Sequence, residues 1–236
     1  MNRTRIEWVV NPDGMQGFTW NPIVGCTREC SYCYARRQAK RFKQLCQQCY
    51  DFMPHLHRER LDEPLCRKKP ATIFLGSMAE MWGPGVLSGW LAEVASIVRD
   101  CPQHTFLSLT KEPLHMVSWL GDDYFENWWL GTTVESAQLQ QRVLWLSGRG
   151  ARFVSFEPLL GPTDRLDSMS ARSFDWAIIG GQSGRGARPP ELAWVKDLLD
   201  DLQSWGIPVF VKDNCPWEDA WGPKPRALPY PQERTE

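Results

Sequence analysis

The sequence predicts an α/β fold: a parallel β/α barrel of the TIM type that is incomplete and carries a small metal-binding insertion. Short apolar runs recur from residue 71 onward, and amphipathic stretches separate them, as in repeated βαβ units. The chain has 236 residues, whereas a complete barrel usually needs about 250. We therefore expect one barrel domain over residues 1–216, with an insertion at about 44–70 and a C-terminal tail over 217–236.

The first strand is expected at residues 19–24, directly before a loop rich in cysteine. Six further strands are expected because nearly every residue in each run is apolar, as in parallel strands covered on both faces. These runs are residues 72–76, 105–109, 129–134, 153–156, 176–179 and 208–211. Apolar residues at helical spacing predict helices over 87–98 and 192–202. Pro190 can open the second helix and Gly206 can close it.

Composition and charge favour a globular protein of the cytoplasm. The chain carries 27 basic and 28 acidic residues, and no run approaches 18 apolar residues. The N-terminus lacks a signal-peptide pattern, so we expect no membrane partner. Residues 1–70 hold 13 basic and 7 acidic side chains, so a nucleic-acid partner would meet this third of the chain. The candidate contacts are Arg36, Arg37, Lys40, Arg41 and Lys43, for which a solvated helix face is an equal alternative.

Three cysteines give the strongest functional signal. Cys26, Cys30 and Cys33 stand at Cys-x3-Cys-x2-Cys spacing within residues 25–34. Three thiolates can hold three irons of a 4Fe-4S cluster and leave the fourth iron open to a ligand. The alternatives are a zinc site or chance clustering, but zinc would need a fourth ligand and more often uses paired Cys-x2-Cys units.

The cysteine motif resembles that of the radical S-adenosylmethionine (radical SAM) superfamily. Further segments resemble a phage-associated and bacterial family of this superfamily that is close to spore photoproduct lyase. They are residues 19–22, 60–64, 109–111, 129–135, 152–162 and 179–184. The resemblance implies S-adenosylmethionine on the open iron, a 5′-deoxyadenosyl radical that abstracts hydrogen, and an electron donor such as flavodoxin or ferredoxin. A nucleic-acid base, in DNA repair or modification, is the favoured substrate; a small metabolite or partner peptide stays open.

The resemblance also implies cofactor contacts at successive strand ends. Tyr32 matches an aromatic position near the adenine. Ser77 and Glu80 stand where many members have Gly-Gly-Glu, which holds the amino group of the cofactor. Hydroxyl and carboxylate groups that can bond a ribose follow the fourth strand: Thr132, Thr133, Glu135 and Ser136. Ser136 is equally well explained as a helix N-cap.

Polar residues at the ends of later strands are candidates for a substrate pocket. Barrel geometry would bring the ends of parallel strands to one cavity. The candidates are Lys111, Glu157, Gln182, Lys212 and Asp213, each of which can also be explained by a surface salt bridge. The Cys215 thiol can serve as a hydrogen-atom donor, although structural packing is the favoured interpretation for this residue.

The insertion contains a second set of metal ligands. Cys46 and Cys49 are followed by His55 and His57, which makes a complete tetrahedral zinc set. Cys66 can replace one histidine, and the alternatives are an auxiliary iron–sulfur cluster or no metal. A competing function for the whole chain is a non-enzymatic, zinc-stabilised protein that binds nucleic acid.

Overall fold

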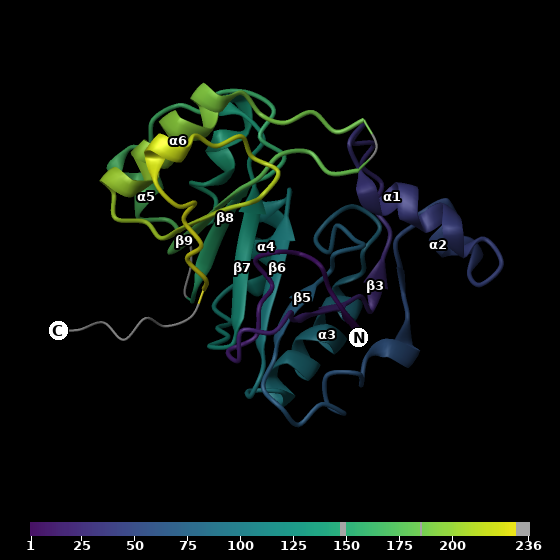
Figure 1. Ribbon diagram of the computed structural model, residues 1–236. Coiled ribbons are helices and arrows are strands. Elements are labelled where there is room, and N and C mark those ends of the chain that lie inside the picture. The colour runs from purple at the N-terminus through teal and green to yellow at the C-terminus, as the bar shows by residue number, and fades with distance from the viewer. Residues whose placement is uncertain (147–149, 185, 230–236) are drawn as a thin grey trace.

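The computed structural model describes residues 1–146, 150–184 and 186–229, and they form an α/β protein around one large sheet (Figure 1). The sheet runs in the order β1-β2-β5-β6-β7-β8-β9-β10. Its strands are β1 (Asn2–Arg3), β2 (Phe18–Trp20), β5 (Thr72–Leu75), β6 (Thr105–Thr110), β7 (Trp128–Thr133), β8 (Arg152–Phe156), β9 (Trp176–Ile179) and β10 (Val209–Val211). All neighbours pair in parallel except β1 and β2, which are antiparallel.

The other elements flank this sheet or belong to the insertion. The α-helices are α1 (Tyr34–Ala39), α2 (Gln47–Asp51), α3 (Ser88–Asp100), α4 (Pro113–Leu120), α5 (Ser168–Ala171) and α6 (Leu192–Ser204). The 3-10 helices are η1 (Lys40–Phe42), η2 (Arg58–Arg60), η3 (Ala137–Arg142) and η4 (Asp219–Trp221), and a small separate sheet pairs β3 (Ile23–Val24) with β4 (His55–Leu56). No helix among the described residues is long and apolar enough to cross a membrane.

The six strands expected after residue 71 are all present, within one or two residues of their expected bounds. The strand expected at residues 19–24 is wrong as a single element. It is divided into β2, in the main sheet, and β3, which pairs with the insertion. Pro22 has no N–H to donate, and the side chain of Asn21 binds the loop after β5, so the chain leaves the main sheet at this point.

Both edges of the large sheet are occupied by antiparallel segments. β1 lies along the outer edge of β2, and Arg226 pairs with Phe210 at the outer edge of β10. Val211 N donates to Pro225 O at 2.9 Å, and Ala227 N donates to Val209 O at 3.1 Å. No closed ring of strands is found in the described parts of the chain, and the barrel geometry stays a prediction.

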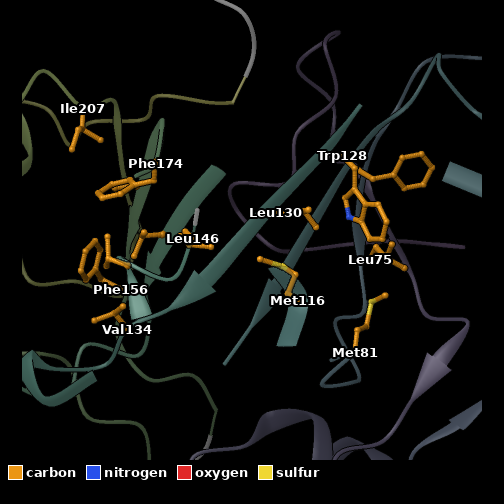
Figure 2. Packing of buried hydrophobic residues seen from close by; sticks show 14 of the residues in the cluster. Leu75, Met81, Met116, Trp128, Leu130, Val134, Leu146, Phe156, Phe174 and Ile207 are labelled. Atoms are coloured by element: carbon orange, nitrogen blue, oxygen red, sulfur yellow. The ribbon is translucent and has the colours of Figure 1, made fainter. Parts of the chain in front are cut away.

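One face of the sheet packs against helices α3 to α6 and holds most of the core. Alternate strand residues point to this face because side chains alternate along a strand. Figure 2 shows Leu75, Trp128 and Leu130 packed with Met116 of α4. The Trp128 indole is fully buried and donates to Ser108 Oγ at 2.9 Å, so its polar atom is satisfied.

The opposite face is covered by the N-terminal segment. Trp8 packs on Phe74, Phe153 and Trp176, with ring centroids 4.8 to 6.2 Å apart. Its indole and the fully buried Val9 thus take the place that a helix takes on the other side. This second apolar layer leaves the strand ends above it for polar groups.

The segment expected as an extended tail, residues 217–236, is part of the fold as far as residue 229. Besides the strand pairing along β10, Trp176 Nε1 donates to Ala227 O at 2.8 Å, and Leu228 packs on the second apolar layer. Trp217 and Trp221 pack edge to face with ring centroids 5.2 Å apart. Residues 230–236 lie outside the described residues.

Candidate functional site

The cysteine loop begins directly after β3 and is held at a tight approach of two backbones. Gly25 has φ of 103°, and a Cβ there would lie 2.2 Å from the Met53 carbonyl oxygen. Only glycine tolerates both the positive φ and this contact. Gly25 N donates to Met78 O at 2.9 Å, and Cys26 N donates to Phe52 O at 3.0 Å. The first thiol is therefore fixed against the insertion.

Two of the three thiols of the loop accept backbone hydrogen bonds. Cys26 Sγ accepts from Arg28 N, and Cys33 Sγ accepts from Arg36 N at the start of α1, both at 3.3 Å. The guanidinium of Arg36 donates to the carbonyls of Cys26 at 2.9 Å and of Arg28 at 2.6 Å. Backbone N–H···S bonds like those accepted by Cys26 and Cys33 are known to tune the reduction potential of iron–sulfur clusters.

The three thiols of the loop differ from the insertion's ligands in how closely they are gathered. Cys26, Cys30 and Cys33 are all half-buried, yet they are not among the ligand groups whose atoms lie within 4.8 Å of one another in the described residues. Ligands of one zinc ion must lie within about 4.6 Å of each other, since Zn–S bonds are about 2.3 Å. Thiolates of a cluster bind different irons and lie further apart. The three half-buried thiols of one short loop are candidate ligands, and a 4Fe-4S cluster at this loop stays a prediction.

Glu135 joins the cysteine loop to the strand ends. Its carboxylate accepts from the Tyr32 hydroxyl at 2.5 Å and from Arg142 at 2.9 Å, and it forms an ion pair with Lys111. Glu135 is buried. The burial of the Tyr32 hydroxyl and the negative charge of Glu135 both raise the pKa of that hydroxyl. The Lys111 ammonium lies 5.4 Å from the Tyr32 ring centre. Tyr32 thus stays protonated and donates to the carboxylate.

A second ion pair lies on the same face of the sheet. Lys212 binds Glu157, and a Cβ on Gly180 would meet both side chains at 2.8 and 2.9 Å. Lys212 follows Phe210 by two residues, and Glu157 follows Phe153 by four, so both point to the face that Trp8 covers lower down. The strand ends therefore present two pairs of opposite charges above an apolar layer.

A small polar cleft lies beside the cysteine loop. Its volume is about 130 Å³, and Tyr32, Arg37, Gln182 and Ser183 are among its lining residues. The loop after β9 reaches α1 in Figure 1, where Arg37 donates to Ser183 O at 3.1 Å. Gln182 already accepts from Arg188 N at 3.1 Å. Gln182 and Tyr32 thus line one cleft, and their roles toward a cofactor or substrate stay predictions.

The other expected cofactor residues have protein partners of their own. Ser77 Oγ and the Asn21 side-chain amide are joined by hydrogen bonds. Glu80 is fully buried and accepts from Thr110 Oγ1 and, at 2.8 Å, from Lys111 N; burial raises its pKa. Thr132 is buried, and its hydroxyl donates to Thr110 O at 2.9 Å.

Two further candidates of the fourth strand lie close to Glu135. The carbonyl of Thr133 accepts from Arg142 at 2.9 Å, which ties this strand end to the 3-10 helix that follows. Ser136 stands at the N-cap position of η3, but its side chain makes no capping hydrogen bond. A capping role therefore does not occupy its hydroxyl.

Asp213 lies apart from the other strand-end side chains, whereas Cys215 lies near the pair of Lys212 and Glu157. Asp213 is exposed and pairs with Arg226. Cys215 is buried, its thiol faces Ile179 O at 3.5 Å, and burial raises its pKa to about 12. The structure brings together Lys111 with Glu135 and Lys212 with Glu157, and Cys215 N donates to Lys212 O at 3.2 Å, whereas Asp213 pairs at the edge of the sheet.

The insertion gathers its four candidate ligands tightly. Cys46, Cys49, His55 and His57 offer ligand atoms that all lie within 4.8 Å of one another. Cys49 Sγ lies 3.4 Å from His55 Nε2 and 3.1 Å from His57 Nε2, and Cys46 Sγ lies 3.5 Å from His55 Nε2. Tetrahedral ligands of one zinc ion are about 3.3 to 3.8 Å apart, so two of these separations lie in that range and two, including the 2.8 Å between the Nε2 atoms of His55 and His57, lie slightly below it. The arrangement therefore fits one metal ion, and the exposed Cys66 is not part of it.

Sequence reasoning missed the residues that hold the loop and the strand ends in place. Arg28 forms an ion pair with Glu112, and Arg142 is buried against Glu135. Asn21 binds both Ser77 and Met78 N. No local pattern marks these residues, because each acts on a partner that is distant in the sequence or lies beyond a turn.

The family of the chain is shown by its match to a family model. A family model described as "Protein of unknown function (DUF5131)" matches residues 3–227. The chain belongs to this family. The resemblance to the radical SAM superfamily and to spore photoproduct lyase is therefore wrong as an assignment, because DUF5131 is the family found and no radical SAM family matches. Neither a curated protein nor a solved structure matches the chain.

Proposed function

We propose that this DUF5131 member is an iron–sulfur enzyme. Cys26, Cys30 and Cys33 hold a 4Fe-4S cluster, and S-adenosylmethionine binds at the iron that lacks a cysteine. The observation that carries the proposal is the 2.5 Å hydrogen bond from Tyr32, within the cysteine loop, to Glu135. It sets the loop against the charged strand ends, so a ligand on an open iron would meet groups that can bind it.

When bound, a reduced cluster and S-adenosylmethionine supply one-electron chemistry: reductive cleavage of the cofactor and removal of a hydrogen atom from a substrate. The residues of the chain bind and orient. Lys111 and Lys212 offer positive charge to a carboxylate, whereas Glu135 and Glu157 offer negative charge to an ammonium or sulfonium group. Because cleavage consumes one electron, the enzyme requires a donor such as flavodoxin or ferredoxin.

A nucleic-acid base is the proposed substrate class. Arg36 and Arg37 bind backbone carbonyls of the protein, so they support the loop. Lys40, Arg41 and Lys43 are exposed, and no ion pair with a carboxylate is found for them in the described part of the chain. Lys40 also donates to Tyr50 O at 3.2 Å, and the Lys40 and Lys43 ammonium groups lie 4.4 and 5.6 Å from the centre of the Tyr50 ring. Three such cations next to the cysteine loop provide a site for phosphate groups.

The test is anaerobic purification of the full chain followed by reduction in the presence of S-adenosylmethionine. We expect a brown protein with about four irons in the cluster, and release of 5′-deoxyadenosine. Cys30→Ser should lose the iron and the product. Cys66→Ser is the matched control, since it changes an exposed thiol outside both ligand sets, and it should keep both.

The competing function is a non-enzymatic protein that binds nucleic acid and is stabilised by zinc. The tight Cys2His2 group favours a role for zinc in either case. A colourless protein with zinc in place of iron, and no 5′-deoxyadenosine from the reduced wild type, would overturn the enzyme proposal in favour of this alternative.

A further inference from the structure

The metal-ligand group of the insertion lies directly beside the cysteine loop. We propose that Cys46, Cys49, His55 and His57 form a closed structural zinc site, and that this zinc holds Cys26 in position. The proposal does not depend on what the cysteine loop binds. It assigns the insertion a task within the fold, namely to support the loop from outside the large sheet.

The chemistry of the four ligands favours a closed site. Cys49, His55 and His57 are buried, and Cys46 is half-buried. Two thiolates and two imidazoles complete a tetrahedral zinc shell and leave no position for a substrate. Cys49 N donates to Cys46 Sγ at 3.3 Å, which fixes the position of that sulfur. A catalytic zinc site would instead keep an open position.

The hydrogen bonds of the two histidines already place the correct nitrogen atoms toward the ion. His55 Nδ1 faces Met53 O at 2.7 Å, and His57 Nδ1 faces Glu59 Oε1 at 2.6 Å. Both Nε2 atoms therefore point inward, where they lie 2.8 Å apart. Metal-binding histidines commonly use one nitrogen for the ion and the other for a carbonyl or carboxylate.

Contacts link this ligand group to the cysteine loop along the chain. His55 pairs with Val24 in the small sheet formed by β3 and β4. The Met53 carbonyl that accepts from His55 also lies against Gly25, and the Phe52 carbonyl accepts from Cys26 N. Residues 52–55 therefore run beside residues 24–26, and a change in one segment reaches the other directly.

The insertion has little other means of holding this shape. α2 has five residues and β4 has two, and elements of this length are not stable by themselves. Phe52 also takes a left-handed conformation, with φ of 57°. Bound zinc supplies the missing stabilisation, because a site that forms only in the folded state makes metal binding part of folding.

The first test measures zinc in the purified full chain. We expect one zinc per chain, its loss in Cys46→Ser/Cys49→Ser, and its retention in Cys66→Ser. Glu59→Gln should weaken zinc affinity by about tenfold, whereas Asp62→Asn, an exposed acid in the same insertion, should not. Unchanged zinc in the double cysteine variant, or iron in place of zinc at these ligands, would overturn the proposal.

The second test measures the link to the cysteine loop. In a full-length Cys30→Ser chain, zinc is removed by a chelator and then restored, and amide hydrogen exchange is followed by mass spectrometry. Exchange in residues 24–27 should rise at least tenfold without zinc and recover with it, while β7 and β8 stay unchanged. Faster exchange confined to residues 46–57 would refute the link. Because Cys30→Ser removes one proposed cluster ligand, neither result depends on the iron–sulfur enzyme proposal.

Discussion

Tyr32 and Glu135 are 103 residues apart in the sequence and meet in a hydrogen bond of 2.5 Å. The carboxylate that accepts this bond is buried and also binds Lys111 and Arg142. One acidic group thus holds two cations and the cysteine loop. Its removal should affect the loop and the sheet together.

Glu135→Gln is expected to destabilise the fold by about 3 kcal/mol, because removing one partner of a buried ion pair leaves the other charges without compensation. Lys111 and Arg142 are both largely buried, so water cannot replace the carboxylate fully. Urea unfolding measures the effect. Asp200→Asn breaks the exposed pair with Lys196 and should cost less than about 1 kcal/mol. Equal effects of the two variants would contradict the central role of Glu135.

Gly131→Ala should destabilise the sheet by about 1 to 3 kcal/mol, the usual range for overpacking. A Cβ at this position would lie 2.6 Å from Phe153 O and 2.7 Å from the Phe153 ring, and backbone cannot move aside. Gly89→Ala is the matched control in α3, where a Cβ meets nothing within 4 Å. It should raise stability by up to about 1 kcal/mol, since alanine favours helix. Thermal unfolding would show opposite shifts of Tm, and shifts of the same sign would disprove the packing argument.

The Glu80 carboxyl should make stability fall as pH rises. Burial raises the pKa of this carboxyl above its ordinary value of 4.5, so in the window above pH 4.5 the native state holds a proton that the unfolded state has released. Stability changes with pH in proportion to the protons bound by the unfolded state minus those bound by the native state, and this difference is negative here. The stabilisation that the protonated Glu80 carboxyl contributes is therefore lost as the pH rises from 4.5 through the raised pKa. Glu80→Gln should flatten the wild-type profile in this window, whereas Glu126→Gln, at an exposed acid, should leave it unchanged.

Lys40, Arg41 and Lys43 should give salt-dependent binding of a single-stranded oligonucleotide. Three phosphate contacts predict a slope of about −2 in log K against log salt concentration. Fluorescence anisotropy with the variant Lys40→Gln/Arg41→Gln/Lys43→Gln should show loss of that slope. The control variant Arg165→Gln/Arg172→Gln/Lys196→Gln removes the same amount of charge near α5 and α6, which lie far from α1 in Figure 1. This variant should keep the salt-dependence slope of the wild type. Equal loss in both variants would point to net charge and not to this site.

The parts of the fold that depend on local patterns could be predicted from the sequence. Each strand after residue 71 is a continuous apolar run, and the ligands Cys46, Cys49, His55 and His57 lie within twelve residues, so their spacing alone brings them together. The division of the first strand could not be predicted, because it depends on Asn21 binding a loop 56 residues away.

The strand-end residues show the same limit. Alternation along each strand places Lys111 and Lys212 on one face, but it does not reveal which carboxylate each will bind. The placement of Asp213 depends on Arg226, whose segment returns to the edge of β10. The sequence pattern of an extended tail contains no sign of that return.

The covered edges of the sheet have a further consequence for self-association. An uncovered parallel strand offers a row of free N–H and C=O groups to other chains, and such rows are templates for aggregation. Residues 2–3 cover this row on β2, and residues 225–227 cover it on β10. Truncation of the chain after η4 would remove residues 225–227 and expose the edge of β10. These residues therefore protect the protein against aggregation through that edge.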